Sequence, residues 1–392
     1  MEKHKINKLK LIFSILIGLI IGVLSFFTSI GIIFSPERKI LWTLLCIFFI
    51  SVIVFLILWN KIISKKVYLL LSLPVLCIIT GIIIIQYRLY IENIPAVEEE
   101  NVYVWSHIPF NKNSFLARLD ENSNLKITEN MPILNGATAL YPIYASFVEA
   151  VYPENKYDDF IEGLVRCSGT GSAYENLYSG AADMIFCAEP SESQLKMFAD
   201  DNINLKMIPI GKDAFVFFVN KENPVNNLTI EDIKKIYSGK IKNWKKLNGK
   251  NQPIKIFQRP NNSGSQTALA KLMENTPIKK AKRENVSKGM GSIINQVAVY
   301  KNFPNAIGYS FLFFTVEMTK NNKIKLLSIE GIYPSRESIQ DNSYPFSGSF
   351  YAIYIDDDKK NENIEPFINW ILSNQGQSLI SKTGYLPVKT GD

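Results

Sequence analysis

The hydrophobic positions of the chain follow two patterns that meet near residue 87. Before it, three long runs without a charged residue occupy residues 11–34, 40–60 and 67–87. Each run reaches the roughly 20 residues that an α-helix needs to cross the hydrocarbon core of a bilayer. The first run is longer than the roughly 7 to 15 apolar residues of a signal peptide, so we expect it to be retained. The pattern predicts three transmembrane helices.

The basic residues near these runs indicate an orientation. Lysines cluster before the first run and between the second and third, whereas the opposite side carries Arg38, Lys39 and Arg88. By the positive-inside rule, the N-terminus is cytoplasmic and the chain after Tyr87 is extracellular, which predicts a multi-pass protein of the cell membrane. The same lysines account for the net charge of +7, because acidic and basic residues balance from Arg88 on. The charge therefore gives no reason to expect nucleic acid as a partner.

Histidine and cysteine are scarce, with two and four residues in the whole chain. Two histidines argue against a His-rich metal site and against a Ser-His-Asp triad, so we expect no metal, no cofactor and no catalytic residues. Cys167 and Cys187 lie beyond the hydrophobic runs, and two cysteines do not make a disulfide scaffold.

Beyond residue 87, short apolar runs alternate with amphipathic segments. Residues 88–130 are expected to form an extracellular spacer, part of which docks onto the next domain through Trp105, Ile108 and Phe110. Strands alternating with helices predict an α/β fold with a parallel sheet covered on both faces. The strands are expected at residues 131–136, 163–167, 182–188, 205–210, 214–219, 253–258, 305–311, 324–329 and 350–355, and the helices at residues 139–151, 174–179, 229–237, 263–274, 289–300 and 363–381.

Three glycine-punctuated turns each lead from a predicted strand into a predicted helix. The amides at a helix start lack partners within the helix and carry a partial positive charge, which suits an anion. An arginine adds a planar fork of donors that matches an oxyanion. The turns therefore predict a site for a small anion, with candidate residues Thr138 and Ala139 in the first turn, Gly169, Thr170 and Gly171 in the second, and Arg259, Ser263, Gly264 and Ser265 in the third.

The motifs GATALYP, SGTG and RPNNSGSQT, in this order and spacing, resemble the substrate-binding proteins of phosphate ABC transporters over roughly residues 131–388. The resemblance implies a type II periplasmic-binding-protein fold that binds inorganic phosphate and delivers it to an ABC transporter permease. It implies two lobes joined by a two-strand hinge, one at residues 131–213 and 313–392 and the other at 214–312, with the candidate residues holding the phosphate oxygens. It also places the strand at 131–136 between those that end at Cys167 and Cys187, too far apart for a disulfide.

One position departs from this family. The family places an aspartate just after the third strand, where it accepts the proton of phosphate, but this chain has Ala188 there and Glu189 one residue later. A shift of one residue along a strand reverses the direction of the side chain. Glu189 is therefore only a possible acceptor.

Two alternatives remain beside the phosphate-binding hypothesis. The membrane anchor is also compatible with a sensor or scaffold of the same fold with a changed or lost ligand. In addition, motifs at residues 193–196, 300–302 and 382–384 mimic those of penicillin-recognising serine enzymes. That reading needs Ser193 activated by Lys196 on one helix, whereas the segment at 382–384 is expected to end a helix at Gly384.

Overall fold

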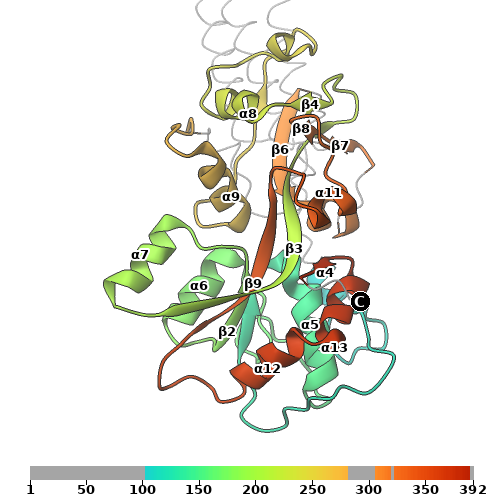
Figure 1. The fold of residues 1–392 in the computed structure, drawn as a ribbon, viewed down its shortest axis with the longest axis vertical. Coiled ribbons are helices and arrows are strands. Elements are labelled where there is room, and N and C mark those ends of the chain that lie inside the picture. The colour runs from blue at the N-terminus through green and yellow to red at the C-terminus, as the bar shows by residue number, and fades with distance from the viewer. Residues whose placement is uncertain (1–101, 281–304, 319–321, 389–392) are drawn as a thin grey trace, which may run out of the picture. The chain divides into compact units, whose positions relative to one another are not determined.

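A computed structural model describes residues 102–280, 305–318 and 322–388 (Figure 1). Among these residues, no helix combines the length and the apolar character that crossing a membrane requires. The three predicted transmembrane helices, at residues 11–34, 40–60 and 67–87, lie outside the described residues, and so does the helix predicted at 289–300.

The described helices and strands alternate along the chain. The helices are α4 (Val102–Trp105), α5 (Tyr141–Val151), α6 (Thr170–Tyr178), α7 (Glu192–Asp200), α8 (Ile230–Tyr237), α9 (Gly264–Met273), α11 (Arg336–Gln340), α12 (Ile364–Ile371) and α13 (Asn374–Thr383), with the short helical turns η2 (Thr138–Leu140), η3 (Trp244–Leu247) and η5 (Phe314–Met318). The strands are β1 (Leu134–Gly136), β2 (Met184–Cys187), β3 (Leu205–Asn220), β4 (Asn227–Leu228), β5 (Lys255–Ile256), β6 (Ala306–Phe311), β7 (Ile324–Leu326), β8 (Ser328–Ile329), β9 (Ser347–Ile355) and β10 (Leu386–Pro387).

The long strand β3 runs through the middle of the main sheet, whose order is β1-β2-β9-β3-β6-β5. β3 pairs antiparallel with β9 over its first part and with β6 and β7 over its second part. β1 is parallel to β2, and β5 is parallel to β6. The sheet is therefore mixed, which corrects the expected parallel sheet. The apolar pattern of a strand shows that it is buried but does not show in which direction it runs.

The two runs predicted as separate strands at 205–210 and 214–219 form this one strand. The sequence from Gly211 to Asp213 suggests a break, but the backbone stays extended there and forms a β-bulge between Pro209 and Gly211. Gly211 is needed because a Cβ at this position would lie 2.2 Å from Cζ of Phe350 on β9. At this polar stretch β3 and β9 therefore approach each other closely, and the chain does not turn.

Strand order around the first turn is as predicted. β1 lies between β2, to which it is parallel, and Val165, to which Leu134 forms a parallel bridge. The segment predicted as a strand at 163–167 contributes only that bridge. Cys167 and Cys187 are both free thiols.

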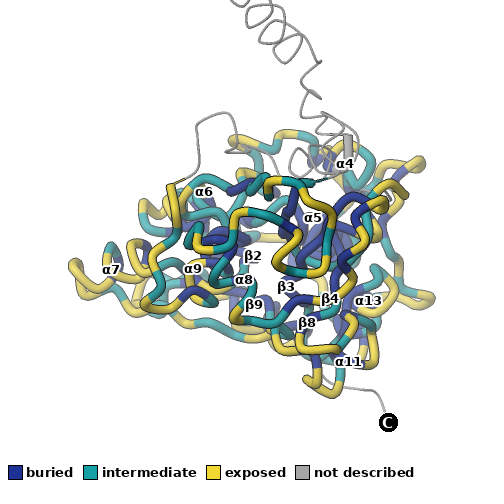
Figure 2. Tube along the Cα trace, turned by 90° about the horizontal axis from the view of Figure 1, so that it is seen from above, coloured by how far each residue is buried: buried dark blue, intermediate teal, exposed yellow. Residues whose placement is uncertain are grey.

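Hydrophobic packing gathers the described elements into two lobes that share β3. We call the part around Phe147, Phe186 and Phe367 the lower lobe. The part around Phe217, Ile233 and Tyr309 is the upper lobe. Both names follow the places of the lobes in Figure 1. In the lower lobe, alternate residues of β2 face opposite sides of the sheet, and a smaller cluster with α6 and α7 covers the second side. Figure 2 shows the strands in the buried interior and α7 at an exposed edge.

The predicted residue boundaries of the lobes stay a prediction. Phe313 and Phe314 pack in the lower lobe, where residues 313–392 were expected. Ile329, Ile339 and Tyr344 instead pack in the upper lobe, because the chain returns there through β7, β8 and α11 before β9. The chain therefore crosses between the lobes more often than two strands require.

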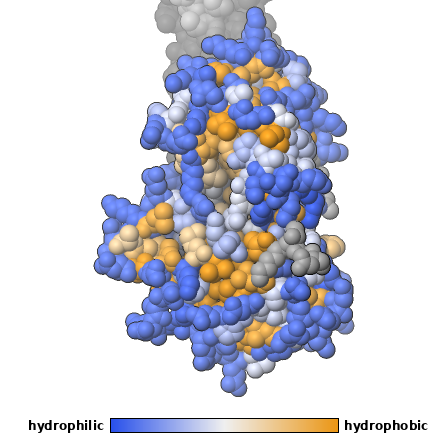
Figure 3. Space-filling model, in the orientation of Figure 1, coloured by the Kyte–Doolittle hydropathy of each residue, from blue (hydrophilic) through white to orange (hydrophobic). Residues whose placement is uncertain are grey.

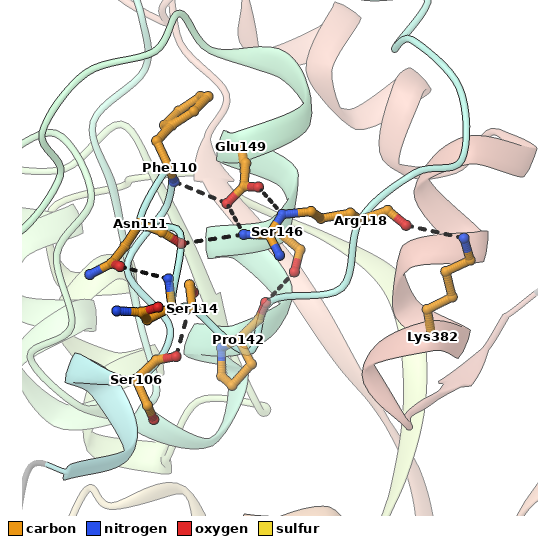
Figure 4. Close-up of polar contacts among 10 residues, drawn as sticks. Ser106, Phe110, Asn111, Ser114, Arg118, Pro142, Ser146, Glu149 and Lys382 are labelled. Carbon is orange, nitrogen blue, oxygen red and sulfur yellow. Dashed lines mark hydrogen bonds and ion pairs between the residues drawn. The ribbon is translucent and has the colours of Figure 1, made fainter.

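Residues 104–130, which we call the strap, are fastened to the lower lobe. Trp105 packs edge-on against Phe160 at 4.8 Å between ring centroids, which confirms that the predicted spacer docks onto the following domain. The Glu149 carboxylate on α5 accepts hydrogen bonds from the Phe110 amide at 3.0 Å and from Arg118 Nε at 2.5 Å. Lys382 on α13 donates to the Arg118 carbonyl at 3.1 Å, so the strap bridges two helices (Figure 4).

One predicted helix is confirmed at its start, and another is not a single helix. Thr229 caps α8 as predicted, since its hydroxyl accepts a hydrogen bond from the Asp232 amide and the Asp232 side chain accepts one from the Thr229 amide. The final helix predicted at 363–381 is wrong as one element, because it is broken into α12 and α13 at Ser373, whose backbone is extended. Gly376 follows the break, and a Cβ there would lie 2.3 Å from the Ile371 carbonyl oxygen.

Candidate anion-binding site

The first two predicted turns are tied together by the side chain of Asn135. Its Oδ1 accepts hydrogen bonds from the Gly136 amide at 2.8 Å, the Ser168 amide at 3.1 Å and the Ser168 hydroxyl at 3.0 Å. The Gly169 amide also donates to the Gly136 carbonyl at 3.1 Å. Asn135 is fully buried, so these bonds are shielded from water. The sequence reasoning missed this residue, although its place at the end of β1 was visible.

The threonines of these two turns lie beside cysteine thiols. Thr138 opens η2, and Thr170 opens α6. Burial raises the pKa of the Cys167 thiol to about 11, although hydrogen bonds with Tyr144 and Thr138 lower it. Burial likewise raises the pKa of the Cys187 thiol, and a hydrogen bond with Thr170 opposes that shift. Both thiols are therefore uncharged at neutral pH and do not repel an anion.

The second and third turns meet where α6 of the lower lobe and α9 of the upper lobe begin. A Cβ placed on Gly264 would lie 3.2 Å from the Thr170 hydroxyl oxygen and 3.7 Å from the Ala188 Cβ. A Cβ placed on Gly171 would lie 3.6 Å from the Asn262 carbonyl oxygen. Two helix starts, each with amides that the helix leaves unpaired, thus face one region between the lobes. On the face in Figure 3, paler and hydrophilic residues separate the hydrophobic areas of the two lobes.

The backbone at Arg259 is fixed to α9 and β6. The Arg259 amide donates to Gln266 Oε1 at 3.0 Å and to the Tyr309 hydroxyl at 3.0 Å, and the Tyr309 hydroxyl donates to Gln266 Oε1. Burial raises the pKa of Tyr309, whereas hydrogen bonding from the Arg259 amide and the Arg259 charge lower it. Ser263 caps α9, with its hydroxyl accepting from the Gln266 amide at 3.4 Å. Gln266 and Tyr309 thus position the third turn, a role that depends on tertiary contacts.

Glu189 lies in a contact of its own, separate from the meeting point of the turns. Its carboxylate forms an ion pair with Lys271 of α9 and accepts a hydrogen bond from the Tyr351 hydroxyl at 3.1 Å. The hydrogen bond with Lys271 lowers the pKa of Glu189, although partial burial opposes this shift. Ala188, which follows β2, is the residue whose side chain lies near Gly264. If the family's aspartate aligns with Ala188, as expected from the sequence, this chain has only a methyl group there.

The described structure brings some candidate residues together directly. Thr170, Gly171 and Gly264 meet across the lobes, and the buried Ser265 follows in the first turn of α9. The first turn, with Thr138 and Ala139, is linked to the second by the hydrogen bond from the Gly169 amide to the Gly136 carbonyl. That these residues hold an anion stays a prediction. Among the described residues, no group of three His, Cys, Asp or Glu side chains could hold a metal ion.

The serine-enzyme alternative is met in one respect, because Ser193 and Lys196 both lie on α7, and fails in another. Ser193 lies in the first turn of α7 and donates to Asn262 Oδ1 at 2.8 Å. Lys382 lies in the last turn of α13, where it pairs with Asp120 of the strap at 2.7 Å, and Gly384 ends that helix with a left-handed backbone, φ 109°. The segment at 382–384 is thus a helix end, as predicted, and cannot line a cleft as a strand. Residues 300–302 lie outside the described residues.

Comparison with known proteins gives one family. A family model described as a PBP superfamily domain matches residues 133–375. The phosphate-binding protein PstS of Staphylococcus aureus is 31% identical over 232 residues, which are 57% of this chain and 69% of that protein. PstS of Borreliella burgdorferi is 27% identical over 276 residues, 68% of this chain and 94% of that protein.

A solved structure agrees with the fold. The crystal structure of a phosphate ABC transporter substrate-binding protein from Clostridium perfringens, with bound phosphate, is 24% identical and has a TM-score of 0.51, covering 67% of this chain and 100% of that one. At this identity the likeness speaks for the fold alone. Since the family model covers more than half of the chain and the Staphylococcus aureus relative exceeds 30% identity, the chain belongs to the PBP superfamily and, within it, to the PstS family of phosphate-binding proteins.

Proposed function

We propose that the chain is a substrate-binding protein that captures inorganic phosphate and delivers it to an ABC transporter. The observation that carries this proposal is the meeting of the α6 and α9 starts at Thr170 and Gly264, one from each lobe. Helix-start amides and hydroxyls donate to oxygen, and the fixed Arg259 loop brings a cation to the same turn. Such a donor-rich region suits a small oxyanion, and the relatives are named for phosphate.

Calorimetric titration of the full chain in detergent with phosphate, sulfate and acetate tests this function. We expect saturable heat from phosphate and none from acetate. Absence of heat from all three anions would overturn the proposal and favour a receptor-like protein without an anion ligand.

We propose no catalytic step. The support is that the segment at 382–384, which a serine enzyme of the alternative class would use as a strand lining its cleft, is instead the end of helix α13. Incubation of the full chain with a labelled β-lactam should leave the protein unlabelled.

The membrane anchor and the permease are further parts of the proposal. Their support is the three uncharged runs up to residue 87, the lysines that flank them, and the names of the related proteins. In cells that express the chain, we expect alkaline carbonate to leave it in the membrane and external protease to digest the segment after residue 102. Extraction by carbonate, or protection of that segment in intact cells, would contradict this placement.

A second candidate is a membrane-bound sensor or scaffold for a different oxyanion. It is favoured by Ala188, which stands where an acceptor carboxylate would lie, and by the pairing of Glu189 with Lys271. A site of donors without such a carboxylate has less means to distinguish protonated phosphate from sulfate. Equal or tighter binding of sulfate in the same titration would favour this candidate.

A further inference from the structure

Two groups of side-chain contacts join the lobes on the side of α7 and α9. Figures 1 and 2 both place these helices on the same side of the molecule. α7 packs through Phe198 in the lower lobe, and α9 packs through Leu269 and Met273 in the upper lobe. Contacts between the segment that leads into α7 and α9, or the turn before α9, therefore join the two lobes.

The first group is centred on Asn262. Its Oδ1 accepts hydrogen bonds from the Ser191 hydroxyl at 2.9 Å and the Ser193 hydroxyl at 2.8 Å, both at the start of α7. Asn262 has a left-handed backbone, φ 66°, a conformation that asparagine tolerates better than most residues. Asn262 immediately precedes Ser263, which caps α9, so its left-handed backbone forms the turn that leads into this helix. The third turn, which leads to the candidate anion residues Ser263, Gly264 and Ser265, thus also contacts the lower lobe.

The second group is the ion pair between Glu189 and Lys271. Tyr351 of β9, in the lower lobe, donates to the other Glu189 oxygen at 3.1 Å and thereby keeps the carboxylate in place for Lys271 of the upper lobe. The Glu189 and Lys271 side chains are 47% and 51% exposed, so the pair is screened by solvent and its effect is modest. The ion pair matters because it joins Glu189 of the lower lobe to Lys271 of the upper lobe.

We propose that Glu189, Ser193, Asn262 and Lys271 form a latch that holds the lobes closed over the bound anion without touching it. The proposal rests on the proposed function, because the ligand is what the closed lobes retain. β3 connects the lobes through the backbone, so separation of the lobes leaves β3 intact and breaks the latch first. A latch that exists only in the closed form slows ligand release and leaves the rate of encounter largely unchanged. Glu189, one residue after the expected acceptor position, thus affects the affinity for the anion by stabilising the closed form of the lobes.

The test measures phosphate affinity and release in the full chain, with latch variants beside a matched control. We expect Lys271→Ala and Ser193→Ala each to raise the Kd about 2- to 5-fold, mainly through faster dissociation. Asn262→Gly keeps the left-handed backbone but removes both hydroxyl contacts, and should raise the Kd about 5- to 10-fold. The double variant Glu189→Lys with Lys271→Glu should bind more tightly than either single variant. The effect of Lys271→Ala should shrink in high salt.

The control is the ion pair between Lys234 and Glu274, which are 2.8 Å apart and both lie in the upper lobe, on α8 and at the end of α9. Lys234→Ala removes an ion pair between α8 and the end of α9 without touching the other lobe, and should leave the Kd and the dissociation rate unchanged. Equal effects of Lys234→Ala and Lys271→Ala would overturn the latch, because the loss would then be a general effect on α9.

A second measurement needs no ligand. Hydrogen exchange of the full chain without phosphate should be faster at residues 190–195 and 262–267 in Lys271→Ala and Asn262→Gly than in the wild type, and unchanged in Lys234→Ala. If the wild type binds no phosphate, the proposed function fails, and this exchange pattern still decides the latch. Exchange in these two segments that does not differ between the latch variants and the control would refute it.

Discussion

Two of the described places where the lobes meet are built in opposite ways. On the hinge side, β3 continues from one lobe into the other, the Phe215 amide donates to the Phe346 carbonyl at 3.0 Å, and the Asp213 carboxylate accepts from the Ala214 and Phe313 amides at 2.8 and 3.3 Å. On the side of α7 and α9, side chains make the contacts, and Glu189 and Lys271 are half-exposed.

The backbone pairing along β3 is therefore harder to break than the side-chain contacts of α7 and α9. A paired strand loses its hydrogen bonds only when the sheet comes apart, whereas exposed side-chain contacts exchange one at a time with water at a cost of about 1 kcal/mol or less. The comparison predicts that changes in the side-chain contacts between the lobes, at Glu189, Ser193, Asn262 and Lys271, alter anion affinity and leave unfolding largely unaffected. Changes at the hinge should do the reverse.

The largest effect is expected at Arg259. Arg259→Ala should weaken phosphate binding by about 2–5 kcal/mol, roughly 30-fold to several thousand-fold in Kd, because the anion loses its fork of charged donors. Arg259→Lys should restore only part of this, since a point charge does not reproduce the fork. Ser263→Ala should cost about 1–2 kcal/mol. Calorimetric titration measures all three, and unchanged affinity in Arg259→Ala would contradict the site.

Ala188→Asp should sharpen selectivity. It places an acceptor carboxylate near Gly264 and Thr170, where protonated phosphate can donate to it and sulfate cannot. We expect sulfate binding to weaken by about 3 kcal/mol relative to phosphate, through repulsion between like charges. Competition between the two anions measures the ratio. A ratio equal to that of the wild type would mean that residue 188 does not face the ligand.

At the hinge, Gly211→Ala should destabilise the fold by about 1–3 kcal/mol. The new Cβ would lie 2.2 Å from Cζ of the buried Phe350 ring, so the ring or the strand must move. Denaturant unfolding followed by tryptophan fluorescence should show a lower midpoint. A matched substitution is Gly348→Ala on the neighbouring strand, where a Cβ meets no atom within 4 Å, and its midpoint should stay near that of the wild type.

The smallest effect concerns the pH dependence of the hinge. Burial raises the pKa of Asp213 to about 7, although hydrogen bonds from the Ala214, Phe313 and Leu312 amides lower it. Because the folded state holds this proton more tightly than the unfolded state, the contribution of Asp213 to stability falls as pH rises from about 4 to 7. Asp213→Asn should remove that slope and add about 1 kcal/mol above pH 7, allowing for the partial exposure of the residue. Unfolding midpoints at pH 5 and 8 for both proteins measure it, and parallel slopes would contradict the assignment.

Features set by neighbouring residues could be predicted from the sequence. Thr229 marks the start of α8 and Ser263 that of α9, since a cap and its helix lie within a few residues of each other. The three turns could be found for the same reason. The sequence did not show that β3 is continuous or that β9 runs antiparallel to it, because strand partners lie far apart in the chain. Nor did it show that Glu189 pairs with Lys271, or that Asn135 joins two turns.

The strap is attached to one lobe and not to the other within the described residues. Its described contacts, from Glu149 on α5 to Lys382 on α13, are all with the lower lobe. A change in the separation of the lobes would therefore leave the strap beside α5 and α13 and would change only its distance from the upper lobe. Because these contacts lie on α5 and α13, the described contacts of the strap leave the junction of the lobes at β3 unconstrained.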